Sequence, residues 1–149
     1  MQIVAFRCSD VSFGVPIHRV REIVTVPQIT PVPECPTFVR GIINLRGRIL
    51  PVLDLGQRLG LPEGPRDGSG RILIVEQDPQ HLLGMLVDQA SEVLRVPDEG
   101  LAPPPELAAH GAGGAVTSVA RLDERLVLLL DLDRVLTQEM LPALGRAAL

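Results

Sequence analysis

Aromatic residues are nearly absent from this chain of 149 residues, which has three Phe, no Tyr and no Trp. Positive charge is also scarce: the chain has 14 Lys and Arg residues and 18 Asp and Glu residues, which give a formal net charge of −4. A single-stranded nucleic-acid binder needs aromatic side chains for base stacking and a basic groove for the phosphates. The composition excludes this class of protein, and the negative net charge argues equally against a polybasic anchor on a membrane surface.

Long hydrophobic runs are missing as well. The longest uninterrupted apolar run, Leu126 to Leu130, is far shorter than the roughly 20 residues that span a bilayer. Residues 1–7 lack the basic start, the apolar core and the cleavage site of a signal peptide, and they predict a first β-strand instead. Cys8 and Cys35 lie outside any C-x-x-C spacing, as is typical of buried thiols in a reducing compartment. We therefore expect a soluble cytoplasmic protein.

The sequence contains an internal repeat whose offset grows along the chain. Residues 14–27 match residues 84–97 at an offset of 70, residues 29–33 match 101–105 at 72, and residues 48–55 match 125–132 at 77. The collinear order of these three blocks indicates a duplication. We expect one half over residues 1–62 and the other over 71–133, joined by a linker over 63–70 that is rich in Gly and Pro.

Each half has the pattern of short β-strands. Val11, Phe13, Val15 and Ile17 alternate with other residues, and residues 71–75 and 126–130 are short apolar runs. Sheets built from such strands protect their edges by closing, so the sequence predicts a mainly all-β protein with two small barrels. Helices are expected to be short. Helical spacing occurs at Val20, Ile23 and Val24 and at Val87, Ala90 and Leu94, and the tail over 134–149 is expected to form a C-terminal helix that packs on the barrels.

Catalytic and metal-binding patterns are not found in the sequence. His18, His81 and His110 are scattered, and no Cys/His zinc pattern or glycine-rich phosphate loop occurs. Asp54 and Asp131 occupy matching positions after matching strands, so we interpret them as caps of the helices that follow. We expect no catalytic residues, no metal and no cofactor. A small enzyme with a dispersed site is the remote alternative.

Two charged residues stand out as candidates for binding. Leu45-Arg46-Gly47-Arg48 is a turn signal between apolar stretches, which places Arg46 near a hairpin tip, within reach of a partner's carboxylate or carbonyl groups. Arg46 is equally well explained as an internal brace of its own loop. Glu22 lies between apolar residues and is repeated as Glu92, so a docking role and a structural role are both consistent with the sequence.

A family resemblance is carried by Val20-Arg21-Glu22-Ile23 and by the long segment from Pro36 to Leu55, which includes Asn44-Leu45-Arg46-Gly47. With the segments around Gly84–Asp88 and Leu128–Leu132, the chain resembles the CheW-like chemotaxis adaptor family over nearly its whole length. The resemblance implies a single CheW-like domain over residues 1–149, with two SH3-like five-stranded barrels and no enzymatic activity. It also implies a scaffold that joins chemoreceptor cytoplasmic tips to the regulatory domain of a CheA-type histidine kinase and is recruited through them to membrane-associated arrays.

The resemblance also implies a receptor-binding groove near the junction of the barrels. The residues carried over to it are Val20, Glu22, Ile23, Gly41, Asn44 and Arg46, with Gly41 and Asn44 shaping the adjacent loop. It assigns no kinase-binding residues in this chain. Ala115 and Ser118 stand where the family often has an aromatic residue and a glycine, so packing of the second barrel is expected to differ there. An alternative within the family is an adaptor in a non-flagellar pathway that serves motility, pili or development.

Overall fold

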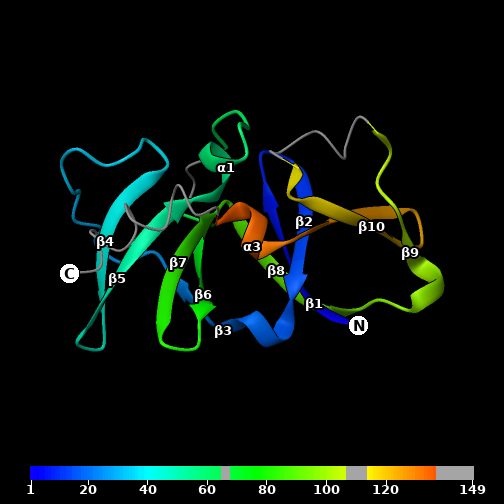
Figure 1. Cartoon of the computed structure of the whole chain (residues 1–149), viewed down its shortest axis with the longest axis horizontal. Helices are drawn as coiled ribbons and strands as arrows, with labels where there is room; N and C mark the ends of the chain where they lie inside the picture. The colour runs from blue at the N-terminus through cyan, green and yellow to red at the C-terminus, as the bar shows by residue number, and fades with distance from the viewer. Residues whose placement is uncertain (65–67, 107–113, 137–149) are drawn as a thin grey trace.

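Two β-sheets lie side by side and account for most of the molecule (Figure 1). The computed structural model describes residues 1–64, 68–106 and 114–136. Within these ranges one sheet has five strands in the order β3-β6-β7-β5-β4, and the other has six in the order β8-β1-β2-β11-β10-β9. The expectation of a mainly all-β chain is therefore confirmed. The six-stranded sheet exceeds the expected five strands by β9, a strand of only two residues.

The strands of the first half are β1 (Gln2–Cys8), β2 (Val11–Pro16), β3 (Val20–Thr25), β4 (Val39–Leu45) and β5 (Arg48–Asp54). Those of the second half are β6 (Arg71–Asp78), β7 (His81–Val87), β8 (Gln89–Arg95), β9 (Leu101–Ala102), β10 (Val116–Leu122) and β11 (Arg125–Leu130). The helical elements are the 3₁₀ turns η1 (Ile17–Arg19) and η2 (Asp98–Gly100) and the short helices α1 (Leu55–Arg58) and α3 (Leu132–Val135).

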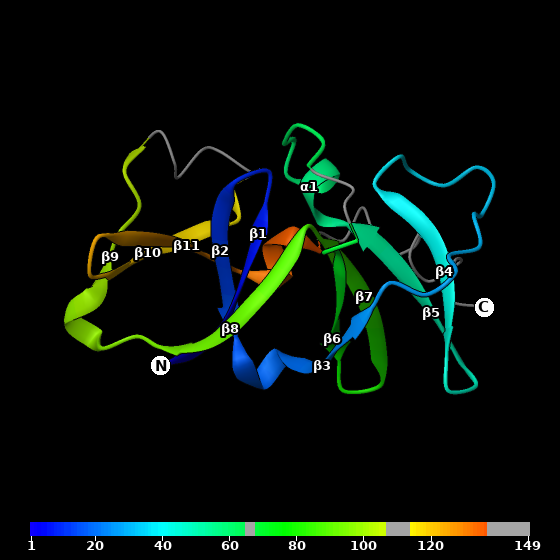
Figure 2. The same ribbon diagram turned by 180° about the vertical axis from the view of Figure 1, so that it is seen from behind.

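The expected division into one barrel per half is wrong, because the halves exchange hairpins. The five-stranded sheet combines β3, β4 and β5 of the first half with the hairpin β6–β7 of the second. The six-stranded sheet combines β8 to β11 of the second half with the hairpin β1–β2 of the first. The physical reason is that β7 pairs in parallel with β5, and β2 in parallel with β11, so each first hairpin completes the opposite sheet. Figure 2 shows β1 and β2 on the side of β10 and β11.

The exchanged halves are nevertheless equivalent. Thr30 forms a bridge with Ile42 on β4, with both backbone hydrogen bonds at 2.9 Å. The offsets of 72 and 77 carry these residues onto Ala102 and Val119, which pair between β9 and β10. In the five-stranded sheet the segment that follows β3 pairs with β4, and in the six-stranded sheet β9, which follows β8, pairs with β10. Each pairing joins the two sides of its sheet and closes the sheet into a barrel.

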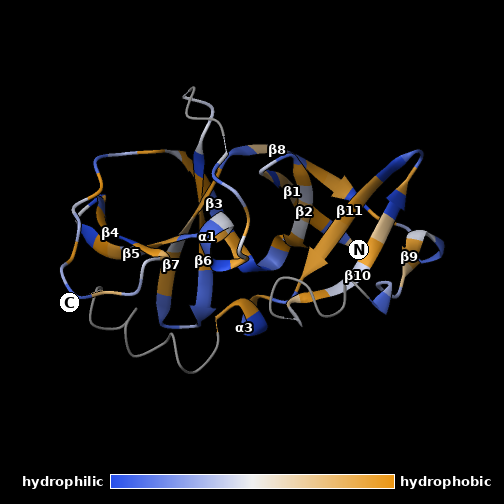
Figure 3. Cartoon of the chain, turned by 90° about the horizontal axis from the view of Figure 1, so that it is seen from above, coloured by the Kyte–Doolittle hydropathy of each residue, from blue (hydrophilic) through white to orange (hydrophobic). Residues whose placement is uncertain are grey.

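Three hydrophobic clusters correspond to this arrangement. One fills the five-stranded barrel and includes Ile43, Val52 and Ile72, and a second fills the six-stranded barrel and includes Ile3 and Val127. The largest cluster, called here the central cluster, lies between the two sheets and draws residues from both. All three Phe residues belong to it or pack against it, and the rings of Phe6 and Phe13 stack with centroids 6.0 Å apart. Figure 3 shows the hydrophobic residues along the strands and hydrophilic ones at many of the turns.

The short helices begin where the sequence predicts. Asp54 Oδ1 accepts a hydrogen bond from Gln57 N at 3.1 Å, and Asp131 Oδ1 accepts one from Asp133 N at 2.9 Å. Both aspartates are the N-caps of their helices, as expected. The segments with helical spacing at Val20–Val24 and Val87–Leu94 are instead strands, because edge-strand pairing outweighs a spacing that only three apolar residues define.

Some expectations concern residues whose structure is not described. The expected C-terminal helix over 134–149 is described only as far as Leu136, and α3 covers its first part. His110 lies outside the described residues, whereas His18 and His81 are exposed, as expected. Cys8 is buried and Cys35 is half-buried.

Candidate functional site

The predicted groove residues on β3 divide between the two faces of the strand. Val20 pairs with Val75 and Ile23 with Leu73, and both partners belong to the central cluster. Val20 and Ile23 therefore continue the central cluster to the surface at the junction of the sheets, where β3 lies (Figure 2). Ile23 is 42% exposed, so its side chain is accessible to a partner at this edge strand.

Glu22 lies on the opposite face of β3, where it pairs with Ile74 of the barrel interior. A bulge between Val20 and Glu22 makes this change of face possible. Glu22 forms an ion pair with Arg46, which stands in the turn between β4 and β5. Since β3 and β4 are the two edges of the five-stranded sheet, this ion pair spans the closure of the barrel.

The turn that carries Arg46 has the geometry of a tight hairpin. Arg46 and Gly47 have positive φ values of 51° and 85°, as both central residues of a type I′ turn do. Asn44 Oδ1 accepts a hydrogen bond from Gly47 N at 2.9 Å and so stabilises the turn. The Arg46 side chain is 68% exposed, so its guanidinium remains accessible while it contacts Glu22. The brace interpretation expects contacts with carbonyl groups of the loop, whereas the contact of Arg46 is with the Glu22 carboxylate on β3, on a side chain that a partner can also reach.

The ion pair also shifts the ionisation of both side chains. The hydrogen bond from Arg46 lowers the pKa of Glu22 below its ordinary value of 4.5. The same hydrogen bond raises the pKa of Arg46. Both groups are therefore charged at neutral pH, and they present a fixed pair of opposite charges on the face of β3 opposite to Ile23, one residue away along this edge strand.

Gly41 is buried and shapes the barrel from within. Its φ is +142°, and a Cβ at this position would lie 2.1 Å from the carbonyl oxygen of Thr30. The absence of a side chain lets the Thr30–Pro31 backbone cross β4 at close range. That Gly41 shapes the loop beside a receptor groove stays a prediction.

The second barrel has a similar Glu–Arg ion pair, although its arginine, Arg125, matches Arg48 and not Arg46 in the internal repeat. Glu92 on β8 forms an ion pair with Arg125 at 2.6 Å. Val93 and Leu126 are 52% and 57% exposed and match Ile23 and Ile49 in the internal repeat, and Ile49 is itself 45% exposed. Sequence reasoning did not select Ile49, Val93 or Leu126. The internal repeat could have indicated Val93, because Val93 matches the candidate residue Ile23.

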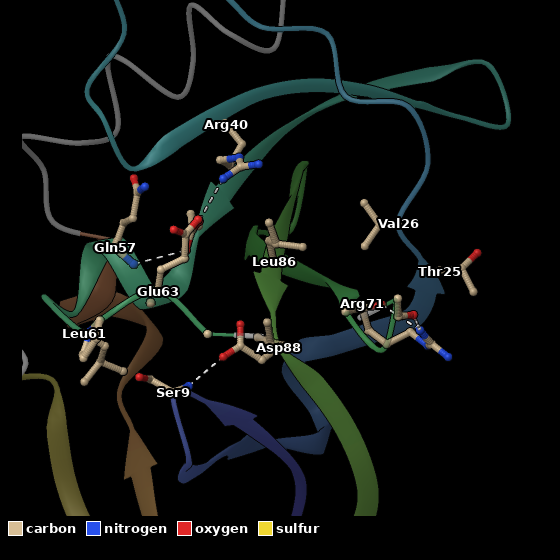
Figure 4. Close-up of a pocket in the computed structure, with 17 residues that line it drawn as sticks. Ser9, Thr25, Val26, Arg40, Gln57, Leu61, Glu63, Arg71, Leu86 and Asp88 are labelled. Carbon is tan, nitrogen blue, oxygen red and sulfur yellow. Dashed lines mark hydrogen bonds and ion pairs between the residues drawn. The ribbon is translucent and has the colours of Figure 1, made fainter. Parts of the chain in front are cut away.

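A cleft of about 680 Å³ lies beside α1 (Figure 4). Its charged groups are held in structural contacts: Asp88 Oδ2 accepts from Ser9 N at 2.7 Å, and Arg40 lies 3.4 Å from Asp54, the cap of α1. Among the described residues no cluster of three or more His, Cys, Asp or Glu side chains is arranged to hold a metal ion. None of the described helices is long and apolar enough to cross a membrane.

Comparison with known proteins decides the family. The family model of the CheW-like domain matches residues 2–140 of this chain. The chain belongs to the CheW-like family. It is 36% identical to the chemotaxis protein CheW of Rhizobium meliloti (strain 1021) over 138 residues, which cover 93% of this chain and 88% of that protein. It is 35% identical to the protein FrzA of Myxococcus xanthus over 100 residues, which cover 67% of this chain and 62% of that protein.

The fold of this CheW-like chain also matches a solved structure. The scaffolding protein TtCheW from Thermoanaerobacter tengcongensis superposes with a TM-score of 0.82 at 32% identity, with 93% of this chain and 89% of that chain covered. The family assignment expected from the sequence is confirmed, and the chain is an adaptor of the chemotaxis scaffold type.

Proposed function

We propose that this CheW-like chain joins the cytoplasmic tips of chemoreceptors to the regulatory domain of a CheA-type histidine kinase. It works in the cytoplasm and reaches membrane-associated receptor arrays through these partners. The observation that carries the proposal is the exposed Ile23, which continues the central cluster to the surface beside the Glu22–Arg46 ion pair. An apolar contact with a fixed pair of charges beside it suits recognition of a helical partner whose register must be set.

The receptor contact is proposed along the free edge of β3, which side chains of both faces of this edge strand reach. Val20 and Ile23 receive the apolar stripe of a helical hairpin tip, while Glu22 and Arg46 fix its register through charge. Asn44 holds the turn that positions Arg46 and contributes no apolar area. The support is the exposure of Ile23 at 42% and of the Arg46 side chain at 68%.

The kinase contact is proposed at the ends of the barrels. Ile49 and Leu126 are the second residues of β5 and β11, close to the hairpin turns, and are 45% and 57% exposed. Leu126 belongs to the six-stranded sheet, whereas Ile49 pairs with Asn44 in the hairpin that carries Arg46. A kinase contact at Leu126 therefore leaves the β3 surface free for the receptor. All three Phe residues lie in or against the central cluster, so both contacts use aliphatic side chains and charges. Strong interface hot spots favour Trp, Tyr and Arg, so we expect modest and reversible affinity.

The experiment measures the binding of variants to a purified receptor cytoplasmic fragment and to the kinase regulatory domain separately. Arg46→Glu should weaken receptor binding by about tenfold or more and leave kinase binding unchanged, because it reverses an interface charge. Arg121→Glu, which reverses the charge of an exposed side chain on β10, is the matched control. Leu126→Ser, in the other sheet, should weaken kinase binding alone. Normal receptor binding by Arg46→Glu would reject the receptor contact.

A charge-swapped double variant separates binding from bracing. Glu22→Arg with Arg46→Glu restores an ion pair of opposite polarity across the same barrel closure. If the two residues contact the receptor, the double variant regains stability but stays weak in receptor binding. If receptor binding returns to the wild-type level, the residues only brace the fold.

The same adaptor in a non-flagellar chemosensory pathway is the second candidate. The similarity to FrzA suggests this candidate, because FrzA is a relative that is not named a chemotaxis protein CheW. A pull-down from the native cell with the wild-type chain tests it. The identities of the recovered kinase and receptor assign the pathway.

A further inference from the structure

A single extra residue in β3 decides which side chains of the proposed receptor contact share a face. β3 lies beside β6 and pairs with it (Figure 2), and Val20 is opposite Val75. The next pair in the register is Glu22 with Ile74. β3 therefore carries one more residue than β6 over this stretch, and the extra residue is Arg21. Such a bulge shifts the alternation of side chains along the strand by one position.

The bulge keeps a charged side chain out of the central cluster. Without it, the register that β3 has from Glu22 onward would continue to the start of the strand, and Arg21 would lie opposite Val75. Val75 is fully buried in the central cluster, where a guanidinium is costly to place. With the bulge, Val20 takes this position and lies on the same face as Ile23.

Arg19, the last residue of η1, holds the chain at the start of the bulge. Its guanidinium donates hydrogen bonds from Nε and Nη2 to the carbonyl oxygen of Glu76 on β6, at 3.1 and 2.8 Å. A carbonyl oxygen has two lone pairs, so Arg19 uses the full accepting capacity of this atom. The planar fork of the arginine donors allows this arrangement, whereas lysine presents a single nitrogen.

Glu76 also binds the bulge residue itself. Its carboxylate accepts a hydrogen bond from Arg21 Nη1 at 2.8 Å, so the residues on both sides of Val20 are attached to one residue of β6. The Arg19 side chain is 21% exposed, whereas the Arg21 side chain is 57% exposed. Exposed ion pairs contribute little, so Arg19 makes the stronger attachment. Arg19 Nη2 also lies 3.3 Å from Asp133 Oδ1 in α3, which fixes the guanidinium from a second side.

We propose that Arg19 is a positioning residue for the receptor contact. By binding the Glu76 carbonyl it fixes the start of β3 on β6, and the bulge then directs Val20 and Ile23 to one face and Glu22 to the other. Without this attachment the start of β3 can leave β6, and Val20 loses its fixed position on the face of Ile23. Arg19 acts through these residues and does not itself contact the receptor. This inference rests on the receptor contact proposed above.

The test compares substitutions at the two ends of the β3–β6 pairing. Arg19→Met keeps an unbranched side chain but removes every donor, and it should weaken binding of a purified receptor cytoplasmic fragment by about tenfold, a typical coupling between neighbouring residues. Binding of the kinase regulatory domain should not change. Arg71→Met is the matched control, because Arg71 lies opposite Thr25 at the far end of the pairing. It also donates to carbonyl oxygens, those of Gly70 at 2.7 Å and Gly68 at 3.3 Å, and its loss should leave receptor binding unchanged. Wild-type receptor binding by Arg19→Met would overturn the proposal.

A double-mutant cycle with Ile23→Ala separates positioning from direct contact. If Arg19 acts through the β3 side chains, Arg19→Met should weaken receptor binding by no more than about threefold in the Ile23→Ala background, because the side chain that it positions is already lost. Losses that multiply would show that Arg19 contributes to receptor binding independently of Ile23, and the positioning role would be wrong.

Two measurements keep the proposal falsifiable if Arg19→Met does not fold. Arg19→Lys keeps the charge and one donating nitrogen, so it should weaken receptor binding by about threefold, as expected for the loss of one hydrogen bond. Undiminished receptor binding by Arg19→Lys would refute the proposal. The NMR signal of the Ile23 methyl group reports the position of β3 without any partner, and it should move in Arg19→Lys but not in Arg71→Met. An unmoved signal would reject the positioning role alone, whereas a wild-type chain that does not bind the receptor fragment would reject the proposed function.

Discussion

Gly41 gives the sharpest prediction about how the fold holds the candidate site. In Gly41→Ala the new Cβ would lie 2.1 Å from the carbonyl oxygen of Thr30 and 2.7 Å from its carbonyl carbon. Both are backbone atoms, so no side-chain rotation relieves the overlap. The Thr30–Pro31 backbone must move away from β4, and the bridge that closes the five-stranded barrel opens.

The expected loss of stability has two parts. A residue with a side chain held at a φ of +142° costs about 1–3 kcal/mol. The two hydrogen bonds between Thr30 and Ile42, both 2.9 Å long, contribute about 1 kcal/mol each. Gly41→Ala should therefore destabilise the chain by about 3–5 kcal/mol, a large share of the stability of an ordinary domain.

Gly47→Ala is the matched control, because Gly47 also has a positive φ, +85°, but a Cβ there would meet nothing within 4 Å. It should cost only about 1–2 kcal/mol from the backbone conformation. Urea denaturation of both variants measures the difference in the free energy of unfolding. If the two variants lose the same stability, the close approach of Thr30 does not constrain Gly41 and the reasoning fails.

Three other predictions test separate parts of the structure. Asp54→Ala and Asp131→Ala should each cost about 1 kcal/mol in urea denaturation through loss of a helix cap, while Asp54→Asn keeps most of the stability; an effect of Asn equal to that of Ala would contradict the cap. Because the folded pKa of Glu22 lies below 4.5, its ion pair stabilises the fold above that pH and ceases to do so as pH falls through the lowered pKa. The stability difference between wild type and Glu22→Gln should therefore shrink in acid, and a difference that grows in acid would contradict the ion pair. Burial raises the pKa of Cys8 to about 12, so a thiol reagent at mildly alkaline pH should modify Cys35 first and Cys8 only after unfolding, and two fast-reacting thiols in the native chain would contradict its burial.

Local features of the fold could be predicted because local chemistry determines them. The caps at Asp54 and Asp131 follow from an acidic residue between a strand and a short apolar segment. The turn at Arg46 and Gly47 follows from two residues that separate apolar stretches. The internal repeat matches Thr30 with Ala102, and the structure shows that both form equivalent pairings.

Hairpin exchange could not be predicted, because it depends on pairings between strands that are remote in sequence. Nothing in the sequence of β1 or β6 shows whether the strand pairs with its own half or with the other half of the chain. Three apolar residues at Val20, Ile23 and Val24 fit both a helix and a strand, and pairing of β3 with β6 decides for the strand. Val20 and Ile23 lie on one face of β3 and Glu22 on the other because of a bulge between Val20 and Glu22, and the sequence carries no signal for this bulge.

Simultaneous binding is the most direct test of the proposed adaptor function. The purified chain is mixed with a receptor cytoplasmic fragment and a kinase regulatory domain, and the mass of the resulting complex is measured by light scattering. The account predicts one complex that contains all three proteins. Arg46→Glu should lose the receptor from this complex, and Leu126→Ser should lose the kinase. Binding of one partner that displaces the other, or binding of neither, would contradict it.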